Sequence, residues 1–254
     1  RAGVEVTLVE RFGCFGGNLT VVGVEGMHWY RHEKTVESNG ICREFEEKAI
    51  EMGSAVPESQ SLSHEIDSEG FKLVADQMVA NEPNVTPMLH RAFVAPVMEG
   101  ETIKGIITES KSGREAILAK RVIDATGDAD VTFRAGGPCH KTPTEEMMAV
   151  SVMFHVAGVN KTKFIEGVKS DPQTYRDWSG GGEWNIETSG KEDEMFSPFL
   201  KKPFEKAIKD GLIPAHLNTI AGTWGAIHDS GELTYMNLIH MDGCDGTDPD
   251  SLTE

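Results

Sequence analysis

Residues 6–20 read VTLVERFGCFGGNLT, and this stretch decides the fold. Apolar residues alternate with polar ones over residues 4–9, which predicts a β-strand. The strand stops at the acidic residue Glu10, and a glycine-rich turn that includes Gly16 and Gly17 follows at once. The second strand of a dinucleotide-binding α/β unit ends in Asp or Glu, which makes the strand end at Glu10 a candidate for that position.

Each part of this stretch has a chemical use. A carboxylate such as Glu10 at the tip of a second Rossmann strand accepts hydrogen bonds from the ribose hydroxyls of an adenosine. Gly16 and Gly17 let the backbone approach phosphate oxygens, and Asn18 and Thr20 add side-chain donors. Taken singly, an acid at a strand end and a pair of glycines are equally typical of a solvated turn. Their combination favours a dinucleotide site.

The composition limits the class of partner. The chain has 254 residues, and 24 basic against 41 acidic residues give a net charge of −17, so no basic footprint for nucleic acid or anionic lipid is present. Its four cysteines form no Cys-x-x-Cys pair, which disfavours a zinc or iron–sulfur site. We expect a cytoplasmic protein, because no apolar stretch has membrane-spanning length and no secretory signal is evident.

The rest of the chain divides into two regions. Apolar residues at helical spacing predict helices over 41–52 and after Asp67, and alternating segments over 88–119 predict a β-hairpin with a third strand. Beyond about residue 140 the helix–strand alternation gives way to short strands and polar stretches. We therefore predict an α/β region over 1–140 and a β-rich, substrate-facing region over 141–254.

A second strand-to-turn motif, RVIDATGDAD, occupies residues 121–130. Residues 122–123 are expected in a buried strand whose carboxyl end faces the ligand. Gly127 then permits a tight turn, and Thr126 offers a hydroxyl. Asp128 either caps the following helix or reaches a sugar hydroxyl; we favour the cap.

Three ordered motifs resemble one protein family. The stretch from Glu10 to Thr20, VIDATGDADVTFRAGG (122–137) and HMDGCDGTDPDSLTE (240–254) are similar to segments of FAD-dependent oxidoreductases with two dinucleotide-binding domains. The last motif resembles a subgroup related to the flavin subunit of heterodisulfide reductase. The resemblance covers the chain nearly end to end and implies an α/β, Rossmann-type FAD-binding domain with a β-rich substrate region.

The resemblance also implies FAD as cofactor and assigns residues to it. Glu10 would hold the adenosine ribose, and Gly16, Gly17 and Thr20 would lie near the pyrophosphate. The backbone of Phe93 or Val94 would contact adenine. The full set of residues expected at FAD is Glu10, Arg11, Gly16, Gly17, Asn18, Thr20, Phe93, Val94, Ala125, Thr126, Gly127 and Asp128.

The family's Gly-x-Gly-x-x-Gly loop, which binds the pyrophosphate at a helix N-terminus, has no counterpart in these residues. We therefore expect a chain truncated at both ends, whose Rossmann domain lacks its first strand. On this expectation the oxidoreductase activity belongs to a longer parent protein, and the fragment alone binds FAD weakly or not at all and is inactive.

The sequence leaves the chemistry on the substrate open. His28, Arg31 and His32 follow the glycine turn and are weak catalytic candidates, because such a segment is as typical of a surface loop. The expected partners are a small-molecule substrate and, as a further candidate, a redox partner protein. Two alternatives stay open: an NAD(P)-binding dehydrogenase, which Glu10 would also suit, and a non-catalytic binding module with a flavoprotein-like fold.

Overall fold

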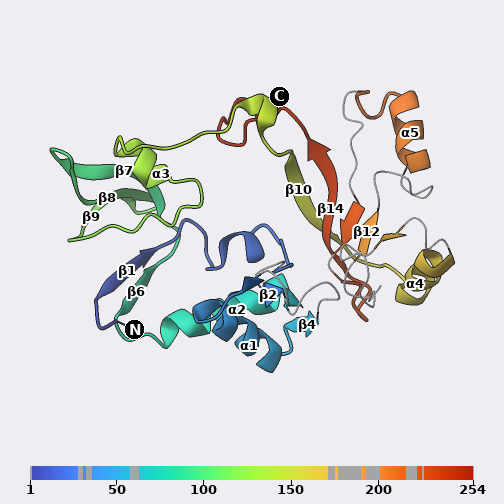
Figure 1. The fold of residues 1–254 in the computed structure, drawn as a ribbon, viewed down its shortest axis with the longest axis horizontal. Coiled ribbons are helices and arrows are strands. Elements are labelled where there is room, and N and C mark those ends of the chain that lie inside the picture. The colour runs from blue at the N-terminus through green and yellow to red at the C-terminus, as the bar shows by residue number, and fades with distance from the viewer. Residues whose placement is uncertain are drawn as a thin grey trace. The chain divides into compact units, whose positions relative to one another are not determined.

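The computed structural model divides the chain into two compact units (Figure 1). Unit 1 comprises Arg1–Phe15 and Ala75–Thr142, and unit 2 comprises Gly16–Val74 and Pro143–Glu254. The structure describes residues 2–27, 31–32, 36–57, 63–170, 175–176, 190–192, 201–215, 222–224 and 226–253.

Unit 1 contains a parallel strand pair and an antiparallel sheet. Strand β1 (Val6–Val9) pairs in parallel with β6 (Val85–Met88), with Val6 opposite Val85. Helices α1 and α2 lie between these strands in sequence, as parallel pairing requires a long crossover. The predicted hairpin and third strand are confirmed as the antiparallel sheet β7 (Ala92–Glu99), β8 (Thr102–Ser110) and β9 (Gly113–Leu118).

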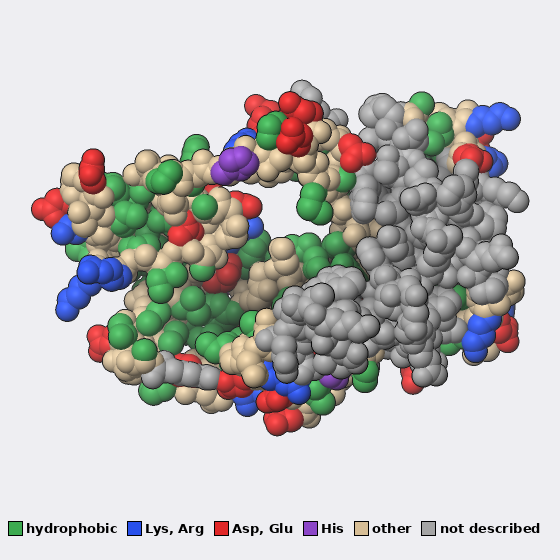
Figure 2. All heavy atoms as spheres, viewed as in Figure 1, with side chains coloured by type: hydrophobic (Ala, Val, Ile, Leu, Met, Phe, Trp, Pro, Cys, Tyr) green, Lys and Arg blue, Asp and Glu red, His purple; other side chains and the backbone are tan. Residues whose placement is uncertain are grey.

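The expectation of a buried strand at residues 122–123 is wrong. Residues 119–125 belong to neither a strand nor a helix, and Ile123 is 86% exposed. An extended segment becomes a strand only where a neighbouring strand pairs with its amides and carbonyls, and no described strand does so here. Leu118 is also exposed, at 71%. Figure 2 shows hydrophobic side chains on the face of unit 1 that is turned to the viewer.

The first part of unit 2 is built on two helices, α1 (Ile41–Glu51) and α2 (Ser68–Ala80). The residues of α2 from Ala75 onward belong to unit 1. The rings of Phe45 and Phe71 pack together with centroids 5.4 Å apart. The strands beside them, β4 (Ala55–Pro57) and β5 (His64–Ile66), pair antiparallel. The buried apolar residues of this layer are Ala49, Ile66, Phe71 and Val74.

A second core lies around a long antiparallel pair of strands in unit 2. Strands β10 (Val150–Val156) and β14 (Leu233–Met241) pair with each other, and α4 (Lys161–Ser170) packs nearby. Trp224 of β13 (Gly222–Trp224) meets Phe164 edge to face at 5.2 Å. The other elements are η1 (Gly17–Leu19), β2 (Arg31–His32), β3 (Val36–Glu37), α3 (Asp130–Arg134), η2 (Thr144–Glu146), β11 (Tyr175–Arg176), β12 (Gly190–Glu192) and α5 (Lys201–Lys209).

The mixture of helices, a parallel pair and antiparallel sheets agrees with the predicted α/β class. The predicted boundary near residue 140 stays a prediction. Among the residues that the structure describes, no helix has both the length and the apolar character that crossing a bilayer requires.

Candidate functional site

Glu10 lies at the carboxyl end of β1 in unit 1. Its own amide donates to Met88 O at 2.9 Å, which extends the parallel ladder by one residue. Its Oε1 accepts a hydrogen bond from the Phe12 amide at 2.9 Å, so the carboxylate folds over the turn that follows. Within the described residues no donor meets Oε2. One carboxylate oxygen therefore orients the group, and the other is available to a ligand hydroxyl.

The turn after Glu10 is held by the loop after β6. His90, whose φ is +56°, donates from its amide to Phe12 O, and Arg91 donates from its amide to Glu10 O at 3.0 Å. A Cβ at Gly13 would lie 2.8 Å from the His90 ring, so glycine is needed there for packing. The guanidinium of Arg11 lies 4.6 Å from the centre of the Phe12 ring. These contacts fix the direction in which Glu10 points.

The glycine turn itself belongs to unit 2. Gly16 and Gly17 have φ of 113° and 53°, and a Cβ on Gly16 would lie 2.5 Å from Thr20 Cγ2. A Cβ on Gly17 would meet no described atom within 4 Å, so one side of this backbone is open. The amides of Gly17 and Asn18 have no acceptor among the described residues. Two free amides beside an open glycine backbone suit an anionic oxygen.

Of the two residues expected at adenine, Val94 already has a partner. Its carbonyl accepts a hydrogen bond from Arg134 Nη1 at 2.5 Å, and the same guanidinium lies 5.8 Å from the centre of the Phe93 ring. Arg134 lies within the motif at 122–137, but nothing in that stretch indicates a partner 40 residues away on β7. The backbone of Phe93 also has a neighbour, because Phe93 lies opposite Thr108 in the β7–β8 ladder.

The Asp-Ala-Thr-Gly-Asp turn is organised by Asp124. Its Oδ1 accepts from the amide and hydroxyl of Thr126, and its Oδ2 accepts from the amide and hydroxyl of Thr132, at 2.7–3.2 Å. Burial raises the pKa of Asp124, but these hydrogen bonds outweigh it and lower the pKa from 3.8 to about 2. The turn is therefore tied to α3 by an ionised carboxylate.

The expectation that Asp128 caps the following helix is wrong. The N-cap of α3 is Ala129, which has φ +58° and no side-chain cap, and the hydroxyl of Thr126 accepts from the Asp130 amide at 2.9 Å instead. Thr126 reaches this amide because Asp124 already holds it in place. Gly127, with φ +97°, makes the turn as predicted, and Ala125 and Asp128 are exposed beside it.

The predicted catalytic candidates are not placed. His28 lies outside the described residues. Arg31 and His32 form the short strand β2, which pairs with β3, but their side chains are not described. Within the described ranges, His, Cys, Asp and Glu side chains form no group of three or more suited to a metal ion, and the four cysteines are free thiols.

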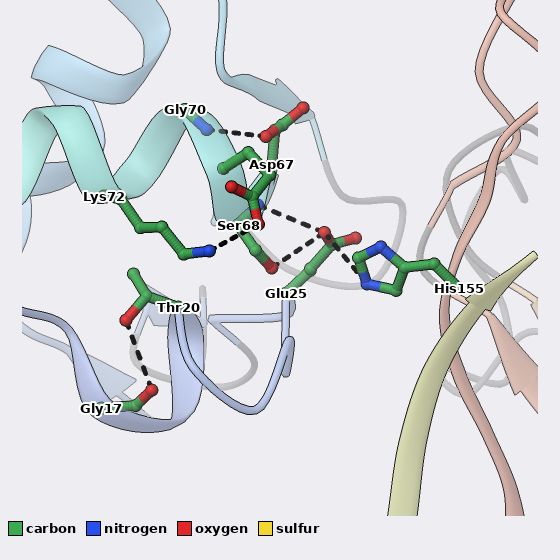
Figure 3. Close-up of polar contacts among 9 residues, drawn as sticks. Gly17, Thr20, Glu25, Asp67, Ser68, Gly70, Lys72 and His155 are labelled. Atoms are coloured by element: carbon green, nitrogen blue, oxygen red, sulfur yellow. Dashed lines mark hydrogen bonds and ion pairs between the residues drawn. The ribbon is translucent and has the colours of Figure 1, made fainter. Parts of the chain in front are cut away.

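One polar cluster in unit 2 escaped sequence analysis altogether. Glu25, which follows the glycine turn by eight residues, is 3% exposed and contacts Ser68 and His155 (Figure 3). No periodicity or motif marks these three residues, which come from three separate segments. A glutamate between Gly23 and Gly26 was the available signal.

Comparison with known proteins identifies the family. The model of the family described as FAD dependent oxidoreductase matches residues 1–239. A search of curated proteins finds no match. The family has a Rossmann-like α/β fold and uses FAD as its cofactor, as the three sequence motifs implied. The match covers far more than half of the chain, and the chain therefore belongs to the FAD dependent oxidoreductase family.

Proposed function

We propose that the protein oxidises or reduces a small molecule through bound FAD. The observation that carries the proposal is the Glu10 carboxylate, which one backbone amide orients at the strand end and whose second oxygen has no described donor. Bound FAD supplies the acceptor or donor for the electrons of the reaction. The chain's own residues bind the cofactor, hold the substrate and move protons.

In unit 1, Glu10 is proposed to accept hydrogen bonds from the adenosine ribose. The hydrogen bond from the Phe12 amide supports this role, because it fixes the Glu10 side chain before the ligand binds. Binding then costs less side-chain entropy. The backbone of Phe93 or Val94 is the proposed adenine contact; the Val94 carbonyl already accepts from Arg134, and Phe93 lies opposite Thr108 in the β7–β8 ladder. Ala125, Thr126 and Gly127 would shape the cofactor cleft, with Asp124 keeping their turn rigid.

In unit 2, the amides of Gly17 and Asn18 are proposed to meet a pyrophosphate oxygen. The open side of Gly17 supports this, because a side chain there would stand between the backbone and a ligand. Thr20 is 3% exposed, and its hydroxyl lies 3.4 Å from Gly17 O. Thr20 is therefore proposed to brace the turn from within rather than to contact phosphate itself.

The setting of the reaction is part of the proposal. The substrate is a small molecule, and a second protein is the proposed source or destination of electrons. We place the reaction in the cytoplasm, since the cysteines are free thiols and a reducing compartment keeps them so.

Flavin content tests the function directly. The protein that carries this chain should purify with an oxidised-flavin absorbance spectrum, and denaturation should release FAD. Bound nicotinamide without flavin would replace the proposal with a dehydrogenase. Binding of neither, after incubation with FAD and NAD(P), would leave a non-catalytic module.

Glu10→Gln tests the residue that carries the proposal. This variant keeps the size of the side chain but removes its charge, and hydrogen bonds to a charged group contribute about 1.5–3 kcal/mol. FAD affinity should therefore fall at least about tenfold. Glu5→Gln, at an exposed position just before the same strand, is the matched control and should bind FAD like the wild type. Equal affinity for all three proteins would refute the role of Glu10.

A further inference from the structure

The cluster in Figure 3 is built around the buried carboxylate of Glu25, which has no part in the proposed cofactor site. Glu25 Oε1 accepts from the Ser68 hydroxyl at 2.9 Å and from the Ser68 amide at 3.2 Å. Ser68 is the first residue of α2, where the helix dipole favours a negative charge. The Glu25 carbonyl also accepts from the Ile66 amide at 2.8 Å. Both the backbone and the side chain of Glu25 are thus fixed.

His155 of β10 faces this carboxylate. Its Nε2 lies 3.8 Å from Glu25 Oε1, and the Glu25 side chain is 4% exposed whereas the His155 side chain is 37% exposed. A Cβ on Gly23 would lie 3.2 Å from His155 Nε2, so the glycine leaves room for the ring. The other ring nitrogen, Nδ1, has no partner among the described residues. The imidazole has the Glu25 carboxylate at ion-pair distance on the Nε2 side and no described partner on the Nδ1 side.

The surroundings leave this pair without a compensating charge. Among the described residues no ion-pair partner of His155 other than Glu25 occurs, and Ser68 behind the carboxylate is neutral. The nearest lysine on α2, Lys72, is paired with Glu69. Glu25 therefore acts on the imidazole as a single buried negative charge.

A second glutamate–histidine pair in unit 2 shows what a purely structural arrangement looks like. Glu46 is fully buried and lies 2.7 Å from His64 Nδ1, and Arg43 Nη1 lies 2.6 Å from its other oxygen. The arginine already compensates the charge of Glu46, and the His64 side chain is only 18% exposed. The pair at Glu25 lacks the arginine and exposes its histidine, which is the arrangement of a carboxylate that orients a base.

We propose that His155 exchanges a proton with the bound substrate and that Glu25 is its positioning residue; this inference rests on the proposed oxidoreductase function. The Glu25 carboxylate favours a proton on Nε2 of the neutral imidazole, which leaves the lone pair of Nδ1 facing outward. Nδ1 then accepts the proton from an O–H or N–H group of the substrate. Glu25 stabilises the imidazolium that forms.

The oxidation of the substrate is balanced when FAD, the cofactor of the family, accepts the two electrons. When the carbon that bears the O–H or N–H group is oxidised, its hydrogen leaves with two electrons for the flavin, and His155 takes the proton. The new bond is C=O or C=N. In the opposite direction the imidazolium returns the proton. The substrate class is accordingly an alcohol or an amine, or the carbonyl or imine formed from it.

The histidine tautomer tests the pair without any cofactor. In the full chain labelled with ¹⁵N at histidine, the ring shifts of His155 should report a proton on Nε2. Glu25→Gln should lower the ratio of the Nε2–H to the Nδ1–H form by about threefold or more, because it removes the charge that selects the first form. Glu46→Gln, the same substitution at the structural pair, should leave this ratio unchanged. A wild-type proton on Nδ1, or a ratio insensitive to Glu25→Gln, would overturn the proposal.

Turnover of the FAD-loaded protein tests the role in the reaction. With a panel of small alcohols and amines and an indophenol dye as final acceptor, His155→Gln should lower kcat by at least about 100-fold. KM and FAD content should stay near wild type, and His64→Gln should retain the wild-type kcat. Equal rates for His155→Gln and wild type would overturn the role of His155 while leaving the flavoenzyme intact. Failure of every alcohol and amine to reduce the dye would overturn the substrate class. Absence of bound flavin would instead refute the proposed function itself, and the role of His155 with it.

Discussion

Asp124→Asn should destabilise the protein at neutral pH and lose much of that effect in acid. The wild-type carboxylate accepts from two amides and two hydroxyls of Thr126 and Thr132, and its pKa falls from 3.8 to about 2. Asparagine keeps the shape but places an NH₂ group opposite donors that need an acceptor. The substitution therefore removes the charge and leaves part of the network unsatisfied.

The size of the effect follows from the pKa. The difference between 3.8 and about 2 corresponds to about 2.4 kcal/mol at roughly 1.4 kcal/mol per pKa unit. Asp124 is partly exposed, so solvent screening reduces the expected contribution to about 1 kcal/mol. The folded pKa is the lower one, which means that this stabilisation is complete well above pH 3.8 and is lost as the pH falls towards about 2. About half of it should be gone at pH 3.

Urea unfolding at pH 7, 4 and 3 measures this loss. The free energy of unfolding of Asp124→Asn should lie about 1 kcal/mol below wild type at pH 7, and the gap should narrow steadily in acid. Asp128→Asn, the same substitution at an exposed neighbour in the same turn, should stay within about 0.5 kcal/mol of wild type at every pH. A gap as large at pH 3 as at pH 7 would refute the electrostatic reasoning, and an equal loss in Asp128→Asn would mean that any asparagine in this turn is harmful.

Two glycines and one aromatic residue provide further predictions. Gly105→Ala should lower the free energy of unfolding by about 3 kcal/mol or more, because the new Cβ would lie 2.1 Å from the backbone oxygen of Ile117. Gly167 lies within α4, and a Cβ there would meet no described atom within 4 Å, so Gly167→Ala should raise the free energy of unfolding by about 0.5–1 kcal/mol. Urea titration of both variants measures these changes, and a Gly105→Ala protein more stable than the Gly167→Ala protein would contradict the reasoning. Phe71→Ala should lower the free energy of unfolding by about 3–5 kcal/mol and the thermal midpoint by roughly 6–20 °C, since Phe71 is 3% exposed and packs on Phe45. A change of less than about 2 °C in calorimetry would show that the α1–α2 layer does not limit stability.

Local features of the fold could be predicted, and features that depend on a distant partner could not. The hairpin β7–β8 follows from alternation and from Gly100, whose φ of +58° suits the turn. Asp67 was expected before α2, and its Oδ1 accepts from the Gly70 amide at 2.8 Å. The segment at 122–123 failed for the opposite reason. Its apolar residues resemble a buried strand, but strand formation is decided by a neighbour that no local pattern describes.

Charged residues in the core show the same limit. Helix spacing predicted an apolar face for residues 41–52, yet Ile41 is 57% exposed while Glu46 is fully buried. A glutamate is placed at the surface by any rule based on residue type. Glu46 is buried because Arg43 compensates its charge and His64, 18 residues away, hydrogen-bonds to its other oxygen. Only the folded chain brings these partners together.

In the candidate site, too, local features could be predicted and contacts with distant residues could not. Glu10 and the glycine turn could be predicted because they are consecutive in sequence and their chemistry depends on their spacing. Contacts from distant residues could not be predicted in this way: His90 donates to the Phe12 carbonyl in the turn after Glu10, and Arg134 donates to the Val94 carbonyl at the expected adenine position. The sequence predicts which groups could meet a cofactor, whereas the structure decides which of them are still free to do so.

That distinction separates the two carboxylates on which the main predictions depend. Asp124 accepts from four donors, two on each oxygen, so its hydrogen-bonding capacity is largely used in holding a turn against a helix. Glu25 is more deeply buried, yet its bonds to Ser68 fall on one oxygen, the oxygen that also faces His155. The donors to Asp124 are amides and hydroxyls of its turn and of α3, so this carboxylate serves to stabilise structure. A buried carboxylate whose remaining neighbour is an exposed imidazole can bias where that imidazole carries its proton, and this is the reason to look for acid–base chemistry at His155 rather than in the Asp124 turn.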